Sequence, residues 1–449
     1  MKILYLVHQF YPNAGWGTEK FVLQLAQRMQ MAGHTVKVIT YDLQPPRPSV
    51  APTRLRYLAL GAPFIRKLTQ KLSTGLRLFT RTIRKRIFGN IVSREYTYDG
   101  IPVIALRQRT PPPFATQRLD DPTLTAFART LFQREQPDLL HVGHAMRMAE
   151  FVQVARALGI PYLLSLTDYW LICPAYILLN DRGELCDGPQ GGKVCRSACP
   201  SIDHTLLAQR PSQAQQLLSG AAQVVAPSQS LAQKMHAEFG GSAIRIISYG
   251  MDQQHLAMNT RHYPTGEPLT FFYAGHLTEH KGIHLLLAAF QRLSAQPIRL
   301  QVYGRGPLEQ AVRQQMQSDP RIRFGGLYTN AQLGNLLSQV DVVVVPSTWH
   351  ENLPLIMQEA QVCGVPTLVS DVGGMTECVT DGVNGFTFRV GEVADLQAKM
   401  QMIIDQPELL NKIKEHMRNP KPGQYRVTSL EEEATLYLEE YAKLYSTAP

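Results

Sequence analysis

Short apolar runs alternate with segments of helical periodicity along this chain. The clearest run is the four consecutive valines at 342–345, which are typical of a parallel strand covered on both faces. Near the N-terminus, residues 2–10 predict a strand, 19–32 a helix that Gly33 ends, and 36–40 a second strand. Such strand–helix–strand units predict an α/β fold with parallel sheets.

Polar, proline-containing stretches divide the chain. A length of 449 residues is too great for one hydrophobic core. The stretch 251–268 is polar and ends in YPTGEP, which predicts a linker. Pro420 and Pro422 break the chain again before an amphipathic terminal segment. The expected parts are an N-terminal domain (1–252), a linker (253–268), a C-terminal domain (269–419) and a terminal helix (420–449).

The segment after the valine run is typical of an anion-binding helix start. We expect a helix over 353–363, capped by Asn352 and with Pro354 in its first turn. The backbone N–H groups of Leu355 and Ile356 would then lack partners within the helix. Together with the helix dipole, they would favour a phosphate.

Two glutamates flank this predicted anion site. Glu351 precedes the helix start, and Glu359 follows about one and a half turns inside. Carboxylates repel phosphate but accept hydrogen bonds from vicinal hydroxyl groups. The pattern therefore favours a ligand with sugar hydroxyls on both sides of a diphosphate, although two solvated glutamates would give the same spacing.

Composition agrees with a large globular protein that stays in the cytoplasm. Hydrophobic residues make up 44% and charged residues 18%. No apolar run approaches the roughly 18 residues that a membrane-spanning helix needs. The apolar stretch 3–7 is too short for the core of a signal peptide.

One segment carries the whole net charge of +9. Residues 64–94 contain nine basic residues and no acidic one. Apolar positions recur there every three or four residues, which predicts an amphipathic helix that can lie on an anionic membrane surface. Packing of the same stripe on the domain is the alternative. Nucleic acid is not expected as a partner, because the segment lacks aromatic residues for base stacking.

Four of the six cysteines fall within the stretch 173–199. Glycines surround them, and the stretch has too little apolar content to fold alone. Four thiolates around a structural Zn²⁺ would fix such a loop. An iron–sulfur cluster, disulfides or free thiols are the alternatives. The four are Cys173, Cys186, Cys195 and Cys199.

The chain resembles the retaining family-4 glycosyltransferases of the GT-B fold. The stretch from Glu351 to Glu359 matches their E-x7-E signature, and further matches follow in the family's order. SLTDYWLICP, at 165–174, opens a cysteine-containing insertion found in a subset of these enzymes. The other matching segments are YAGHLTEHKGIHLLLAAF (273–290), VYGRGP (302–307), IRFGGLYT (322–329) and SDVGGMTECVTDGVNGF (370–386).

The resemblance implies a fold and a reaction. The fold would be two Rossmann-like, doubly wound domains facing a cleft, with the C-terminal helix returning to the first domain. The reaction would move a sugar from a nucleoside diphosphate sugar, UDP- or GDP-linked, to a glycan or lipid-linked acceptor, with retention of configuration. Lys281 would neutralise the diphosphate without a catalytic metal, Glu359 would hold the ribose and Glu351 the donor sugar. The donor site would also include Asn352, Leu353, Leu355 and Ile356.

The resemblance also assigns residues in the first domain. The loop YPNAGWGTE would bring Gly17 close to the ligands, although its glycines can equally serve a turn. His144 follows a predicted strand, PDLLHVGH, and would approach the donor sugar. A structural role is the alternative for His144 and is favoured for His141. Asp168 and Tyr169 are the acceptor candidates, although Asp168 can also cap a turn.

One position departs from the family's pattern. His276 stands where the family has an arginine for the donor diphosphate, and histidine offers fewer donors and a charge only near its pKa. Arg305 in a neighbouring loop can compensate. Otherwise the chain would be a catalytically weak nucleotide-sugar-binding or regulatory protein, or a nucleotide-sugar epimerase of the same fold.

Overall fold

The computed structural model describes residues 1–446 apart from 16, 43–78, 242, 255, 257, 263–265, 294–296 and 422–424. The chain forms two compact units. Unit 1 consists of Met1–Ser165, Gln209–Val224 and Tyr437–Pro449, and unit 2 of Leu166–Ala208 and Val225–Leu436. The domains expected from the sequence are continuous along the chain, whereas these units are each made of several segments. The expected domain boundaries stay a prediction.

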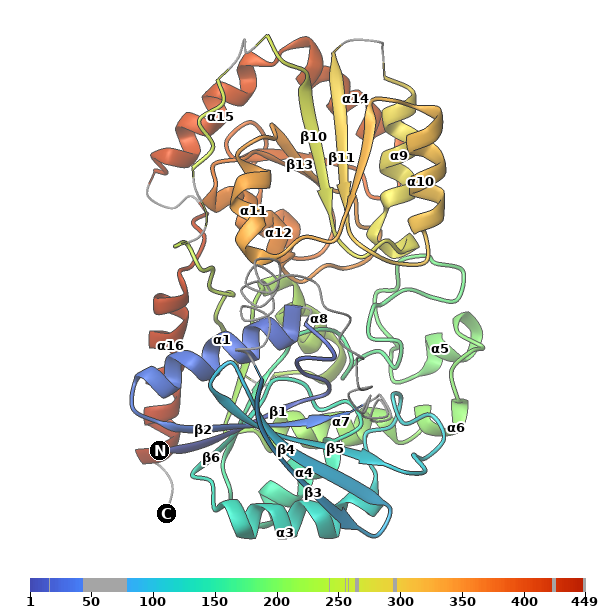
Figure 1. Cartoon of the computed structure of the whole chain (residues 1–449). Coiled ribbons are helices and arrows are strands. Elements are labelled where there is room, and N and C mark those ends of the chain that lie inside the picture. The colour runs from blue at the N-terminus through green and yellow to red at the C-terminus, as the bar shows by residue number, and fades with distance from the viewer. Residues whose placement is uncertain are drawn as a thin grey trace, which may run out of the picture. The chain divides into compact units, whose positions relative to one another are not determined.

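Unit 1 contains a mixed β-sheet whose strands follow the order β3-β4-β5-β2-β1-β6-β7 (Figure 1). The pairs from β5 to β7 are parallel, and β3, β4 and β5 pair antiparallel. The parallel strands are almost entirely buried because helices cover both faces. The bounds are β1 (Lys2–Val7), β2 (Thr35–Tyr41), β3 (Phe79–Phe88), β4 (Ile91–Tyr98), β5 (Ile101–Gln108), β6 (Leu139–Val142) and β7 (Tyr162–Ser165).

Helix α1 (Gly17–Met31) shows why the helices of unit 1 form where they do. It buries Phe21, Leu25 and Met29, which are spaced four residues apart and share one face. The helix ends before Gly33, as the sequence predicts. The other helices of the unit are η1 (Pro122–Leu124), α3 (Thr125–Glu135), α4 (Ala149–Ala157) and α7 (Arg210–Ser219).

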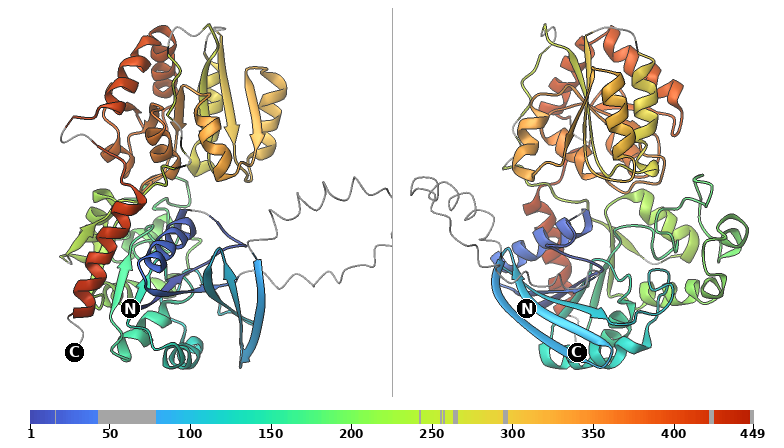
Figure 2. Two further views of the ribbon diagram at one scale, coloured as in Figure 1. Left: turned by 60° about the vertical axis from the view of Figure 1, so that its left-hand side comes forward. Right: turned by 45° about the vertical axis from the view of Figure 1, so that its right-hand side comes forward.

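Residues 79–94 belong to a β-hairpin, so the amphipathic helix expected there is wrong. Strands β3 and β4 pair antiparallel around a turn at Gly89 and Asn90 (Figure 2). Gly89 has a φ of 55°, as the two-residue turns of hairpins require. This Gly-Asn turn outweighs the three- and four-residue spacing of the apolar positions. The rest of the expected helix, 64–78, lies outside the described residues.

Unit 2 contains a six-stranded sheet, and all of its strand pairs are parallel. The strand order is β12-β11-β10-β13-β14-β15. The valine run forms β13, as the sequence predicts. The bounds are β10 (Leu269–Ala274), β11 (Ile298–Tyr303), β12 (Ile322–Gly326), β13 (Val342–Val345), β14 (Thr367–Ser370) and β15 (Gly385–Phe388).

Alternate residues of the central strands enter two separate hydrophobic clusters. Phe271 and Val342 lie in one cluster, whereas their chain neighbours Phe272 and Val343 lie in the other. Successive side chains of a strand point to opposite faces, so helices must cover both faces of this sheet. That double burial is why β13 is apolar at every position.

The remaining elements lie in unit 2 outside its six-stranded sheet, except β8, which spans the boundary between the units. No helix in the described ranges has the length and apolar content needed to cross a bilayer. The bounds are α5 (Lys193–Ala198), α6 (His204–Leu207), β8 (Gln223–Ala226), α8 (Gln229–Phe239), β9 (Ile244–Ile246), η2 (Glu279–Lys281), α9 (Ile283–Gln291), α10 (Glu309–Ser318), α11 (Asn330–Leu337), α12 (Leu355–Val362), α13 (Met375–Cys378), α14 (Val393–Asp405) and α15 (Glu408–Arg418).

The C-terminal helix α16 (Leu430–Ser446) begins in unit 2 and ends in unit 1. In unit 1, the Tyr441 hydroxyl hydrogen-bonds to Nδ1 of His141, and the Tyr437 hydroxyl lies 3.0 Å from Oγ of Ser165. These buried contacts anchor the end of the helix in the first part of the chain. The expected return of the C-terminal helix is therefore confirmed.

Helix α16 also carries a buried carboxyl group, Glu433, which is 2% exposed. It lies against Gly250, where an added Cβ would be 2.9 Å from Oε2 of Glu433. Burial raises the pKa of Glu433 to about 8, because a low-dielectric environment disfavours the charged form. At neutral pH this side chain is therefore protonated in the folded protein.

We expect Glu433→Gln to make the protein more stable at pH 8 but not at pH 4.5. The folded pKa lies above the unfolded value, so the free energy of unfolding of the wild type falls as pH rises from about 4.5 through about 8. Glutamine cannot ionise, so the variant should gain up to a few kcal/mol across that window. Thermal unfolding midpoints at both pH values test this, with Glu431→Gln on the exposed side of the helix as control. An equal difference at both pH values would contradict it.

Candidate functional site

A buried carboxylate and a lysine meet just beyond the carboxyl end of β13 in unit 2. Glu351 is 5% exposed, and its Oε1 lies 2.6 Å from Nζ of Lys281. The hydroxyl of Ser347 donates to the same oxygen at 2.7 Å. The ammonium group also lies 4.8 Å from the ring centre of Trp349, within range of a cation–π interaction. The ion pair is therefore held from several sides.

Two close backbone contacts position the loop that carries Glu351. Gly282 has a φ of 70°, and a Cβ there would lie 1.7 Å from the carbonyl oxygen of Pro346. At Gly374, a Cβ would lie 1.7 Å from the carbonyl oxygen of Asn352. Any side chain at either glycine would push the loop away. The glycines after Lys281 and after β14 are thus required by the position of Glu351.

Helix α12 begins at Leu355, two residues later than expected. Pro354 occupies the N-cap position, where no side chain caps the helix. The prediction that Asn352 caps the helix is wrong, because its Nδ2 instead donates to the carbonyl oxygen of Thr167 at 2.8 Å. Leu353, expected in the first turn, lies before the helix and is buried in the core. An extended Pro354, with a ψ of 123°, explains the later start.

The start of α12 leaves backbone donors available. The N–H groups of Met357 and Gln358 donate to the carbonyl oxygen of Pro354. Those of Leu355 and Ile356 come earlier in the first turn, where a helix supplies no acceptor. Together with the helix dipole they make this end of α12 suitable for an anion.

Glu359 lies further along the same helix and is 7% exposed. Its charge is close enough to Tyr328 to add to the effect of burial, which is the main reason that the pKa of that phenol is raised. A carboxylate that is nearly buried yet borders the helix start is placed to accept hydrogen bonds from a bound ligand. Glu351 thus precedes α12 and Glu359 lies within it, and their joint role in one site stays a prediction.

His276 and Arg305 come from two segments that run side by side. The N–H group of Leu277 donates to the carbonyl oxygen of Arg305 at 2.9 Å. Burial, and then the positive charge of Lys281, lower the pKa of His276, so its imidazole is mainly neutral at neutral pH. The Arg305 side chain is exposed and makes no hydrogen bond or ion pair within the described parts of the chain. It is thus available to an anionic ligand.

In unit 1, His144 follows β6 and packs against a second histidine, His8, which follows β1. The ring centres lie 4.2 Å apart, and the N–H of Met146 donates to Nδ1 of His144 at 3.1 Å. Nε2 of His8 lies 3.8 Å from Oε1 of Glu19 on α1, which begins at Gly17. Parallel α/β sheets bind ligands beyond the carboxyl ends of their strands, and this cluster lies there.

Sequence reasoning identified His144 and Gly17 but missed His8, Glu19 and Arg147. Burial, followed by His144 and Arg147, holds the pKa of His8 well below its usual value. His8 directly follows β1 in the structure, but the sequence placed it inside a predicted strand over 2–10, so the rule that selected His144 did not select His8. Glu19 gave no such signal, because an acidic residue in the first turn of a helix is common.

His141 has the structural role favoured for it. Its side chain is fully buried, and Nε2 lies 2.8 Å from Oγ of Ser165. Burial lowers its pKa to about 3. His141 therefore stays neutral and joins β6 to β7 and α16.

The two acceptor candidates have mainly structural contacts. Oδ1 of Asp168 accepts a hydrogen bond from the N–H of Trp170 at 2.8 Å, which closes a turn. Tyr169 is fully buried, and its ring packs edge-on against His350 with centres 6.1 Å apart. Tyr169 thus does not present its side chain to an acceptor in this structure, because it is part of the core of unit 2.

The four cysteines of the insertion lie in unit 2, and none of them forms a disulfide. Burial, and then Cys173, Cys199 and Cys186, raise the pKa of Cys195 to about 12. Cys195 and Cys199 share a small hydrophobic cluster with Ile202 and Leu207. Within the described ranges, however, no group of three or more His, Cys, Asp or Glu side chains is arranged to hold a metal ion.

Comparison with protein families matches most of the chain. The model described as Glycosyltransferase Family 4 matches residues 16–255, and that described as Glycosyl transferases group 1 matches 260–419. Glycogen synthase of Mycobacterium tuberculosis is 30% identical over 173 residues, which cover 37% of this chain and 41% of that protein. D-inositol 3-phosphate glycosyltransferase 1 of Catenulispora acidiphila is 24% identical over 300 residues, which cover 62% and 66%. The match thus spans about two fifths of the first relative and two thirds of the second.

Solved structures share the fold along the whole chain. Sucrose-phosphate synthase from Thermosynechococcus elongatus has a TM-score of 0.68 at 18% identity, covering 99% of both chains. HepE from Anabaena, in complex with UDP, has a TM-score of 0.65 at 17% identity, covering 99% of this chain and 100% of its own. These likenesses, the parallel sheet of unit 2 and the largely parallel sheet of unit 1 confirm the expected GT-B fold. Because the family model matches more than half of the length of this chain, the chain belongs to Glycosyltransferase Family 4.

Proposed function

We propose that this protein is a retaining glycosyltransferase that moves a sugar from a nucleoside diphosphate sugar to a glycan or lipid-linked acceptor. The observation that carries the proposal is the Lys281–Glu351 ion pair beside the open start of α12. Family membership supports it. So do relatives whose structures hold UDP, UDP-glucose or ADP. The donor nucleotide in this protein would be UDP or GDP.

Positive charge from three sources would receive the diphosphate. Lys281 brings an ammonium group, Arg305 an exposed guanidinium group, and α12 the N–H groups of Leu355 and Ile356. These groups stabilise charge that develops on the leaving diphosphate. The proposed chemistry therefore needs no catalytic metal.

The carboxylates would hold the two sugars of the donor. Glu351, adjacent to Lys281, is placed for the hydroxyls of the transferred sugar, and Glu359, inside α12, for those of the ribose. His144 in unit 1 would approach the transferred sugar, oriented by its contacts with His8 and Met146. Gly17, at the start of α1, would allow backbone to approach the ligands.

A catalytically weak nucleotide-sugar-binding protein is the second candidate, and His276 favours it. A neutral imidazole replaces a permanent charge at the diphosphate, so the leaving group would receive less stabilisation. Under this alternative Arg305 would contribute to binding but no sugar would be released. A nucleotide-sugar epimerase would instead release an altered sugar from the same donor.

Arg305→Ala should slow hydrolysis of the donor sugar about tenfold to a hundredfold, the effect of losing a hydrogen bond to a charged group. The assay follows release of nucleoside diphosphate from UDP- and GDP-sugars by the purified protein, and the released sugar should keep the donor's configuration. Arg389→Ala, at an exposed arginine of the same unit paired with Asp395 at 3.7 Å, is the matched control.

Three outcomes of this assay would count against the proposal. An unchanged rate in Arg305→Ala would remove Arg305 from the site. Donor binding without hydrolysis by the wild type would favour the binding protein. Release of an epimer of the donor sugar would identify a nucleotide-sugar epimerase.

We also propose that the insertion holds a structural zinc ion through Cys173, Cys186, Cys195 and Cys199. Four cysteines of one insertion, two of which (Cys195 and Cys199) share a small hydrophobic cluster, fit the ligand preference of zinc. In this structure they do not form a ligand set, so the thiols would have to turn toward a common centre. Zinc would supply the stability that a cluster of so few apolar residues lacks.

Elemental analysis of protein purified without added metal should find about one zinc per chain. Cys195→Ser and Cys199→Ser should lose it, because a thiolate ligand is removed from a four-ligand site. Cys363→Ser, at a buried cysteine of α12's C-cap, should keep it. Zinc at full occupancy in both ligand variants, or none in the wild type, would show that these cysteines are not its ligands.

We also propose that the protein binds an anionic membrane surface. Residues 79–94 would contribute through the hairpin, since they do not form the helix that was expected there. Lys85 and Arg86 are exposed on β3, beside Ile87, which is 59% exposed. Basic and apolar side chains together favour anionic lipid. Sedimentation with anionic vesicles that did not weaken at high salt would argue against this contribution.

A further inference from the structure

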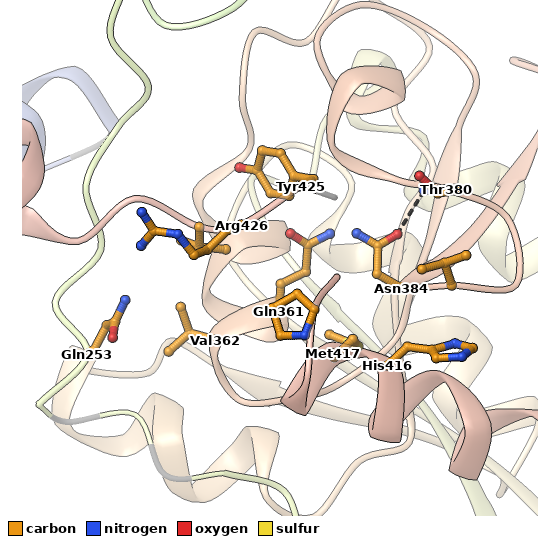
Figure 3. Close-up of a pocket in the computed structure, with 12 residues that line it drawn as sticks. Gln253, Gln361, Val362, Thr380, Asn384, His416, Met417, Tyr425 and Arg426 are labelled. Carbon is orange, nitrogen blue, oxygen red and sulfur yellow. Dashed lines mark hydrogen bonds between the residues drawn. The ribbon is translucent and has the colours of Figure 1, made fainter. Parts of the chain in front are cut away.

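A cavity of about 170 Å³ lies in unit 2 beside the C-terminal end of α12 (Figure 3). Residues from several distant segments line it, among them Gln253 before β10, Gln361 and Val362 on α12, Asn384 before β15, and Tyr425 before α16. It has room for about five or six water molecules. A cavity of this size can receive one sugar ring.

The cavity contains a buried hydrogen-bond acceptor without a partner. Gln361 is 9% exposed, and its Nε2 donates to the carbonyl oxygen of Cys378 at 3.1 Å. This bond fixes the amide so that Oε1 is the free atom, and Oε1 has no hydrogen-bond partner within the described residues. A buried polar atom left unpaired is costly and indicates a missing donor.

The rest of the lining is polar but carries little free charge. Thr380 contributes a hydroxyl, and Val362 and Met417 contribute apolar surface (Figure 3). The Asn384 amide accepts from the N–H of Thr380 and donates to the carbonyl oxygen of Cys378, both at 2.7 Å, so it shapes the cavity wall. The guanidinium group of Arg426 is already neutralised by two hydrogen bonds to Glu432, at 3.0 and 2.6 Å. Neutral amides and hydroxyls beside apolar patches suit a ligand with several hydroxyl groups and a C–H face, and they do not suit a phosphate.

We propose that this cavity is a second carbohydrate site, which binds one neutral sugar unit through a hydroxyl that donates to Oε1 of Gln361. The site is separate from the donor site, because Gln361 lies two residues after Glu359 and so points to another side of α12. The sugar unit comes either from free monosaccharide or from a glycan chain, and the two sources share this chemistry. The proposal does not depend on turnover, so failure of donor hydrolysis would leave it intact.

Binding is measured on the full chain by saturation-transfer NMR and calorimetry. The probes are glucose, galactose, mannose and N-acetylglucosamine, and linear oligosaccharides of each. Inorganic phosphate is the comparison probe. Gln361→Met keeps the shape of the side chain but removes the acceptor, so sugar binding should weaken about tenfold. Val383→Phe fills the cavity and should abolish binding. Gln314→Met, at an exposed position of α10, is the matched control and should bind as the wild type does.

An unchanged thermal unfolding midpoint shows that each variant is folded, and if Gln361→Met fails this check, the comparison of the wild type with Val383→Phe tests the site by itself. Binding of both probe classes, or of oligosaccharide only, supports the proposal, and the second result identifies a glycan as the source. Three results would overturn it: no sugar bound by the wild type at tens of millimolar, equal affinity in the wild type and Val383→Phe, or binding of phosphate in preference to sugar.

Discussion

The candidate site of unit 2 depends on a steric constraint, the close packing of backbone on backbone around the loop between β13 and α12. Carbonyl oxygens of this loop approach Gly282 and Gly374 so closely that a Cβ at either glycine would lie 1.7 Å from an oxygen. The loop is thus held between two segments that are distant in sequence. Only in this position can Glu351 reach Lys281 at 2.6 Å, since Lys281 directly precedes one of the two glycines.

The sheet beneath this loop supplies a rigid support. Its central strands are buried on both faces and divide their side chains between two hydrophobic clusters. Close-packed cores resist displacement. The carboxyl ends of the strands therefore hold their positions, and each strand can be followed by a loop of a different sequence. The two histidines that follow β1 and β6 in unit 1 use the same arrangement.

Local sequence predicts the fold and much of the site because both are encoded by short-range patterns. The valine run specifies a doubly covered strand, and the spacing of Glu351 and Glu359 specifies their placement around the start of α12. Predictions failed where contacts between distant segments decide. Asn352 bonds to Thr167 rather than to its own helix, and Tyr169 is removed from solvent by packing on His350.

The helix predicted where β3 and β4 form a hairpin was wrong for another reason. Two local signals compete there, and the turn at Gly89 and Asn90 prevails because strand pairing with β5 rewards an extended chain. The cavity beside Gln361 could not be predicted at all, since its lining converges from segments more than 150 residues apart, as Gln253 and Tyr425 are.

The ion pair of Lys281 and Glu351 has a consequence for the order in which ligands leave the proposed donor site. A nucleoside diphosphate that draws Lys281 toward its phosphates leaves the nearly buried Glu351 carboxylate without its counter-ion, which is unfavourable. While the donor sugar is bound, its hydroxyls compensate that carboxylate. After the proposed transfer, the Ser347 hydroxyl would remain as a donor to that carboxylate among the described residues. Under the proposed function, re-formation of the ion pair would then favour departure of the spent nucleotide, so the contact that organises the site would also promote product release.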